Sequence, residues 1–131
     1  MSSDPTAVTG VDFAFVPTRD LDAAITFYGT TLGLPCSVEM RDRGFAEFET
    51  GNLTLSVIDS AKMGLEHSPS ANAIALHVGD VAAARERLEA MGVGFAADTL
   101  DTGVCHMAFF GDRDGNALML HHRYAPRMSK A

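Results

Sequence analysis

The pattern of hydrophobic and polar positions divides the chain into two halves with the same order of predicted elements. Short apolar-rich segments at 11–17 and 73–78 are typical of strands, and each precedes an aspartate, Asp20 or Asp80, that is suited to cap the start of a helix. Beyond Asp80, apolar residues recur at the spacing of a helix, at Val81, Ala84, Leu88 and Met91. Strands follow each helical stretch, so each half predicts one strand, one helix and then a run of strands.

An internal repeat relates these two halves. Residues 20–25 have a counterpart in residues 80–85, an offset of about 60 residues, and glycines of the later hairpins repeat at a similar offset. The 131 residues have the length of one domain. We therefore predict a single α+β domain over 1–131, built from tandem βαβββ modules at about 10–60 and 72–122.

Alternation along the strands separates each predicted hairpin into an apolar face and a mixed face. In the first hairpin the apolar face contains Ala46, Phe48, Leu53, Leu55 and Val57. The mixed face contains Glu47, Glu49, Thr54, Ser56 and Ile58. In the last hairpin, a turn at 112–115 places His106 opposite His121, and the apolar face then contains Met107, Phe109, Leu118 and Leu120. The mixed face contains His106, Ala108, Phe110, Ala117, Met119 and His121.

We expect the apolar faces to pack against the helices and the mixed faces to line a concave ligand site. Ligand sites combine apolar walls with a few converging polar groups, as these mixed faces do. Phe13, Phe15 and His77 are expected on the same surface.

Composition and charge restrict the class of function. Hydrophobic residues make up 47% of the chain and charged residues 21%, and no apolar run approaches the roughly 18 residues of a membrane span. The net charge of −7 argues against a nucleic-acid partner. Residues 1–5 lack the features of a secretion signal, which predicts a cytoplasmic protein. Cys36 and Cys105 stand alone, so we expect two reduced thiols.

Two motifs point to a known fold. The segment 20–28, Asp-Leu-Asp-Ala-Ala-Ile-Thr-Phe-Tyr, followed by Leu-Gly-Leu at 32–34, is similar to the first-helix signature of the vicinal oxygen chelate superfamily. The segment 109–116, Phe-Phe-Gly-Asp-Arg-Asp-Gly-Asn, resembles the final-hairpin signature of that superfamily, which includes glyoxalases, bleomycin resistance proteins and extradiol dioxygenases. The resemblance extends over about residues 10–122 and implies a glyoxalase/bleomycin-resistance-type fold with a concave sheet cavity. It also implies a homodimer with pockets shared between chains.

Metal-dependent members of the superfamily hold a divalent ion with His or Glu from the strands. The matching positions here are Phe13, Ala73, Met119 and either Leu55 or Ser56. Because none of these side chains is a suitable ligand for a hard cation, the resemblance implies a member without the usual metal cofactor.

The leading hypothesis is a metal-free protein that binds a small organic ligand or drug, aromatic or cationic in character, with sequestration as its role. The predicted ligand-binding residues are Phe13, Phe15, Glu47, Ser56, His106, Phe110 and Met119, with His77 and His121 beside them.

The alternative is an enzyme, a lyase, isomerase or dioxygenase of the same superfamily. In that case His77 or His121 is the catalytic residue and acts as general base. A displaced divalent metal at His77, His106 and His121, with Glu47 as a carboxylate, remains open within this alternative. A pure interaction module would leave these histidines without a role.

Overall fold

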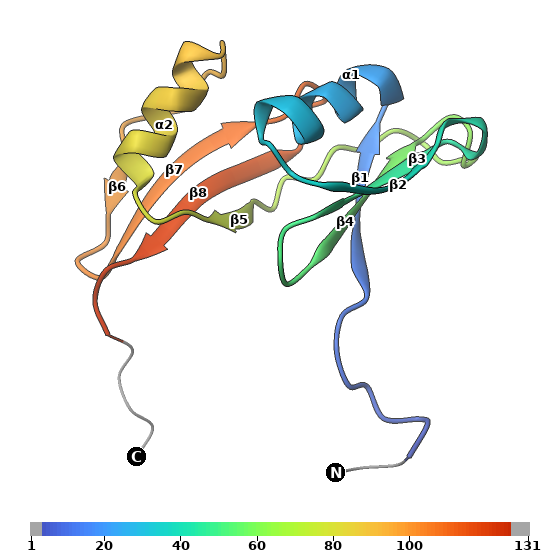
Figure 1. The fold of residues 1–131 in the computed structure, drawn as a ribbon, viewed down its shortest axis with the longest axis horizontal. Coiled ribbons are helices and arrows are strands. Elements are labelled where there is room, and N and C mark those ends of the chain that lie inside the picture. Colours follow the sequence, from blue (N-terminus) through green and yellow to red (C-terminus); the bar gives the residue numbers. More distant parts are fainter. Residues whose placement is uncertain (1–3, 127–131) are drawn as a thin grey trace.

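The computed structural model describes residues 4–126 and arranges them in two four-stranded mixed sheets that lie side by side (Figure 1). Sheet A has the strand order β1-β4-β3-β2, with β1 (Phe13–Thr18), β2 (Cys36–Met40), β3 (Phe45–Glu49) and β4 (Thr54–Asp59). Sheet B has the order β5-β8-β7-β6, with β5 (Ile74–His77), β6 (Leu100–Asp101), β7 (Cys105–Gly111) and β8 (Ala117–Arg123). The predicted α+β fold, with the order βαβββ in each half, is confirmed.

Helical segments connect the strands: α1 (Leu21–Thr26), η1 (Phe27–Thr31), η2 (Arg41–Arg43) and α2 (Val81–Ala90). Both α-helices begin at the predicted aspartates. The carboxylate of Asp20 accepts a hydrogen bond from the amide three residues later at 3.1 Å, and that of Asp80 does the same at 3.0 Å. Within residues 4–126, no helix is long and apolar enough to cross a membrane.

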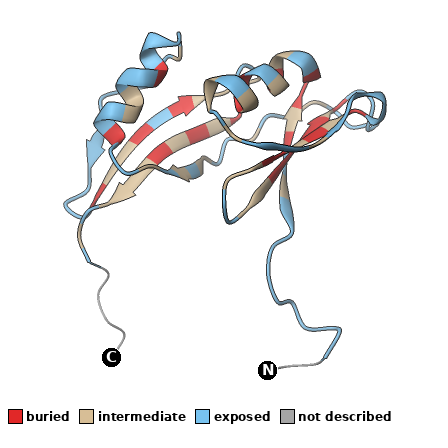
Figure 2. Ribbon diagram, viewed as in Figure 1, coloured by how far each residue is buried: buried red, intermediate tan, exposed pale blue. Residues whose placement is uncertain are grey.

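One hydrophobic core joins the helices to both sheets, and Figure 2 shows it as buried bands that alternate with exposed ones along the strands. In sheet A the predicted apolar face is buried, because Phe48 and Leu55 oppose each other across the ladder and neither is exposed to solvent. In sheet B the strand residues that belong to this core are Ala108, Phe110, Leu118 and Leu120. The core therefore lies on the helix side of each sheet.

The register of β7 and β8 differs by one residue from the sequence prediction. Gly111 pairs with Ala117, and His106 pairs with His122 instead of His121. The connection is longer than predicted because Asn116 belongs to the turn. This side chain is 2% exposed, and its Nδ2 donates to the carbonyl oxygen of Pro17 at 2.8 Å. A one-residue shift turns every side chain of β7 to the other face of the sheet.

A buried hydrogen-bond network ties the two halves together. The hydroxyl of Tyr28 donates to Oδ2 of Asp112 at 2.7 Å, and Nδ2 of Asn116 donates to the same oxygen at 2.8 Å. Burial, together with the adjacent carboxylate of Asp112, raises the pKa of Tyr28 far above its ordinary value. The hairpin turn of the second half is thereby anchored to the first helical segment.

Candidate functional site

Each sheet has one face covered by the helices and one turned away from them, which we call the open face. The open face of sheet A consists of Phe13, Phe15, Phe45, Glu47, Glu49, Thr54, Ser56 and Ile58. The open face of sheet B consists of Ala75, His77, Leu100, Cys105, Met107, Phe109, Ala117, Met119, His121 and Arg123. Most of the residues predicted for the site lie on these two surfaces.

Two exposed phenylalanines dominate the open face of sheet A. Phe13 is 46% exposed and Phe15 is 58% exposed, and their ring centroids lie 5.1 Å apart at an interplanar angle of 58°. Ser56, which pairs with Phe15 in the ladder, is only 3% exposed. The two rings therefore form an aromatic platform above the buried hydroxyl of Ser56. Exposure of two such rings to water is unfavourable, so a ligand that covered them would gain free energy.

Carboxylates lie on the same face as this platform, in β3, with strand β4 between them and the phenylalanines of β1. Glu47 pairs with Ser56, and Glu49 pairs with Thr54. The Glu49 carboxylate accepts hydrogen bonds from Ser37 Oγ at 2.5 Å and Thr54 Oγ1 at 2.6 Å, which lower the pKa of Glu49. Within the described part of the chain, neither glutamate forms an ion pair. The open face of sheet A thus combines aromatic and uncompensated anionic groups.

The open face of sheet B has imidazoles and polarisable apolar groups. His77 pairs with His121 across the parallel ladder. At the end of β5 the His77 ring centroid also lies 5.8 Å from that of His122, which pairs with His106 on the helix side. Phe109, which is 37% exposed, opposes Met119. The two predicted catalytic residues, His77 and His121, both lie on this face. The predicted ligand-binding residue Met119 lies there as well.

Two predicted site residues lie elsewhere. His106 is on the helix side of sheet B, where its Nε2 is 3.4 Å from Asp101 Oδ2 and its ring centroid is 4.7 Å from that of Tyr124. Phe110 is 5% exposed and its ring centroid lies 5.1 Å from that of Phe95 in the core. The one-residue shift of register accounts for both corrections.

The shift also brings residues to the site that the sequence prediction assigned to the core. Met107 and Phe109 now lie on the open face: Met107 opposes His121, the place predicted for His106, and Phe109 opposes Met119, the place predicted for Ala108. The signal that could have located them is the Asn after Gly115, because Asn is a common turn residue that can extend the connection.

The residues at the superfamily's usual metal positions do not fit a divalent ion. Phe13 and Met119 contribute a phenyl ring and a thioether, Leu55 is buried in the core, and Ser56 contributes one neutral hydroxyl. The alternative set of His77, His106 and His121 is not brought together either, because His106 faces away from the other two. Across residues 4–126, no group of three or more His, Cys, Asp or Glu side chains is placed to hold a metal ion.

Solved structures with the same fold include proteins of several kinds. A glyoxalase/bleomycin resistance protein/dioxygenase from Nocardioides is 23% identical with a TM-score of 0.73, and the match covers 94% of this chain and 92% of that one. TnmS3, an antibiotic binding protein from Streptomyces sp. CB03234, is 24% identical with a TM-score of 0.74, covering 90% and 98%. A lactoylglutathione lyase from Agrobacterium tumefaciens is 19% identical with a TM-score of 0.71, covering 90% and 94%. At these identities the likeness concerns the fold.

No curated protein sequence matches the chain. A family model does match, over residues 10–120, and its description is Glyoxalase/Bleomycin resistance protein/Dioxygenase superfamily. With the two βαβββ units and both signature segments inside that range, the chain belongs to the glyoxalase/bleomycin resistance protein/dioxygenase superfamily.

Proposed function

We propose that this protein binds a small aromatic cation and does so without the superfamily's usual metal ion. The observation that carries the proposal is the exposed pair Phe13 and Phe15 on the same face as Glu47 and Glu49, which have no ion-pair partner among the described residues. A planar ligand stacks on phenylalanine rings, and its positive charge is attracted both by the ring faces and by the carboxylates.

The second wall of the pocket comes from the open face of sheet B in another copy of the chain. In one chain the two sheets lie side by side (Figure 1), and Phe13, Phe15 and Phe109 of the open faces stay exposed. Their charges are complementary and leave a net negative charge for the ligand, with the two carboxylates of Glu47 and Glu49 on sheet A against the single guanidinium of Arg123 on sheet B. A twofold dimer that apposes A to B forms two equivalent pockets.

In such a pocket, sheet B contributes adaptable and polar contacts. Met107, Phe109 and Met119 supply apolar surface, and the flexible thioethers adjust to an irregular ligand. His77 and His121 offer ring nitrogens that accept or donate hydrogen bonds. The likeness in fold to an antibiotic binding protein is in keeping with this binding role.

Fluorescence titration with two aromatic probes of opposite charge tests the proposal. Ethidium is a planar aromatic cation, and 8-anilinonaphthalene-1-sulfonate is an aromatic anion. We expect ethidium to bind more tightly, Phe15→Ala to weaken it by about tenfold, equivalent to about 1.4 kcal/mol, and Glu47→Gln to weaken ethidium but not the anion.

Matched controls are available elsewhere on the surface. Leu65 is 55% exposed, close to the 58% of Phe15, and Glu86 is exposed on α2. Leu65→Ala and Glu86→Gln should leave both affinities unchanged. Equal affinity for the two probes, or equal effects of the site and control variants, contradicts the proposal. Light scattering gives the oligomeric state, and a monomer with full ethidium affinity would exclude the shared pocket.

A second candidate function is catalysis as a lyase, isomerase or dioxygenase. The observation in its favour is the pairing of His77 with His121 on one open face, since an imidazole is suited to act as a general base. Mass spectrometry of a bound ligand recovered after incubation distinguishes the two functions. An unchanged ligand supports binding alone, and a product that His121→Ala no longer forms supports catalysis.

A further inference from the structure

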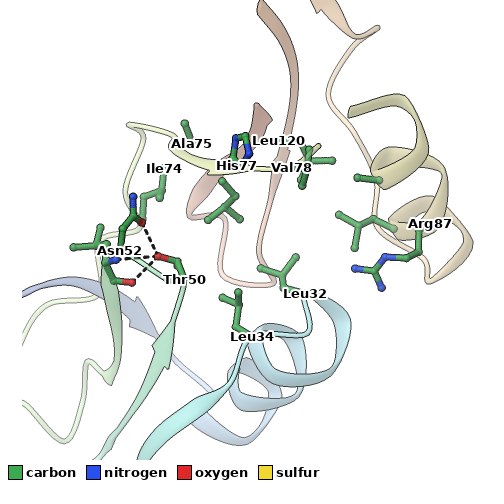
Figure 3. Close-up of a pocket in the computed structure, with 15 residues that line it drawn as sticks. Leu32, Leu34, Thr50, Asn52, Ile74, Ala75, His77, Val78, Arg87 and Leu120 are labelled. Carbon is green, nitrogen blue, oxygen red and sulfur yellow. Dashed lines mark hydrogen bonds between the residues drawn. The ribbon is translucent and has the colours of Figure 1, made fainter. Parts of the chain in front are cut away.

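A cleft lies on the helix side of the molecule, between its two halves (Figure 3). It has a volume of about 380 Å³ and lies between the segment after η1, the β3-β4 hairpin, β5 and α2. Strand β5 forms its boundary. Ile74 and Leu76 pack toward the core, whereas Ala75 and His77 project from the other side of the strand. Ala75 and His77 nevertheless reach the edge of the cleft, whereas none of Phe13, Phe15, Glu47 and Glu49 lines it, so the cleft is distinct from the aromatic and anionic surface of sheet A.

The walls of the cleft are apolar. Leucines from both halves of the chain line it: Leu32, Leu34, Leu53, Leu76, Leu88 and Leu120. Its volume falls within the range of about 300–1,000 Å³ that is usual for small-molecule sites. Such a surface accepts a hydrocarbon body, because burial of apolar area contributes about 25 cal/mol per Å².

The charge on the cleft comes from Arg87, the one arginine or lysine among its lining residues. Figure 3 shows its side chain reaching from α2 toward the cleft. Its Nη1 lies 3.6 Å from Met91 Sδ, and within residues 4–126 it forms no ion pair. The neighbouring Arg85, by contrast, has Glu89 at 3.5 Å and lies over the Phe95 ring.

The polar groups at the other end of the cleft already have partners. Thr50 Oγ1 donates to the carbonyl oxygen of Leu53 at 2.7 Å and lies 3.3 Å from Asn52 Oδ1. They present no charge to a ligand. His77 adds an imidazole at the edge of the cleft, and the permanent charge is the guanidinium of Arg87. A guanidinium favours a carboxylate through two parallel hydrogen bonds.

We infer that this cleft is a binding site for an amphipathic monocarboxylate, such as a medium-chain fatty acid. The hydrocarbon body lies among the leucines, and the carboxylate pairs with Arg87. This ligand has the opposite charge to the one proposed for the open faces, so the two sites differ in chemistry as well as in place.

Calorimetric titration of the full chain with decanoate, below its micelle threshold, tests the inference. Decan-1-ol and decyltrimethylammonium have the same chain with a neutral and a positive head group. We expect decanoate to bind most tightly, and Arg87→Gln to weaken decanoate at least about tenfold while leaving decan-1-ol unchanged. Arg113→Gln removes an exposed arginine from the β7-β8 turn and should change neither affinity.

A second variant tests the place of binding. Ala84 lines the cleft from α2, and Ala84→Leu is compatible with a helix while filling the space. It should weaken decanoate and decan-1-ol alike. Failure of decanoate to bind, or decanoate affinity that is unchanged in both Arg87→Gln and Ala84→Leu, overturns the inference.

The outcome is independent of the proposed function. Phe15→Ala should leave decanoate binding intact, and saturating decanoate should leave the ethidium affinity unchanged. Competition between decanoate and ethidium would place both at one site and contradict a separate cleft.

Discussion

Sheets A and B have the same topology and the same buried side, but their open faces differ in chemistry. On the helix side, both central strands bury leucines completely, Leu55 in β4 and Leu118 in β8. On the open side, sheet A presents phenylalanines and glutamates, and sheet B presents histidines, methionines and Arg123. The repeated unit thus supplies a common scaffold, and a few outward positions differentiate its two copies.

The largest expected effect tests whether the two buried sides form one core. Leu55→Ala and Leu118→Ala each remove a fully buried side chain from the core that joins both sheets. Each should lower the free energy of unfolding by about 2.7–5.0 kcal/mol. Urea denaturation should show a single transition in both variants.

Two separate transitions, or a loss in one sheet that leaves the other unaffected, would contradict a shared core. Leu65→Ala is the matched control, because this leucine is 55% exposed and should cost little.

An intermediate effect is expected at the junction between the halves. Tyr28→Phe removes the hydrogen bond to Asp112, and the loss should be about 1–3 kcal/mol. The pKa of Tyr28 is raised in the folded protein, so the folded chain keeps this proton while the unfolded chain releases it near pH 10. Stability should therefore fall as the pH rises above about 10, and part of this decline should be absent in Tyr28→Phe.

Thermal unfolding between neutral and alkaline pH measures this difference. Tyr124→Phe is the control, because the Tyr124 hydroxyl also donates to an aspartate, Asp101 at 2.7 Å, but is exposed. An alkaline decline identical in Tyr28→Phe and the unmodified protein would show that the junction does not depend on this proton.

The smallest effect separates the two faces of sheet B. His121 lies on the open face and His106 on the helix side, although the sequence prediction placed them opposite each other. His121→Ala should weaken ethidium about threefold to tenfold, as expected for one hydrogen bond worth about 0.5–1.5 kcal/mol. His106→Ala should leave the affinity unchanged, and fluorescence titration compares the two. A larger loss of ethidium affinity in His106→Ala than in His121→Ala would contradict the register seen in the structure.

The sequence predicted the register of the hairpin in sheet A correctly and that of the hairpin in sheet B wrongly, because the two connections differ in length. In sheet A, Phe48 and Leu55 were correctly assigned to the buried face, because the short connection at 50–53 leaves little freedom of register. In sheet B, the longer connection allowed two registers. The correct one depends on the buried Asn116, whose side chain reaches the backbone of Pro17 from 99 residues away.

The residues predicted for the candidate site also fall into those that the sequence placed on the correct face and those that it did not. The residues Phe13, Phe15, Glu47, Ser56, His77, Met119 and His121 were correctly placed on a common side of their strands by alternation alone. The register of the β7-β8 hairpin decided the positions of His106 and Phe110. The cleft beside Arg87 has no sequence signature, because its leucines come from both halves of the chain.

By itself, the sequence determined the family, the two helix caps, the order βαβββ in each half and the alternation of faces within each strand, since all of these depend on local periodicity and short motifs. Only the tertiary structure decided the register of the last hairpin, the two open faces as complementary surfaces and the helix-side cleft. These features depend on contacts between distant segments, and local pattern does not specify which segments meet.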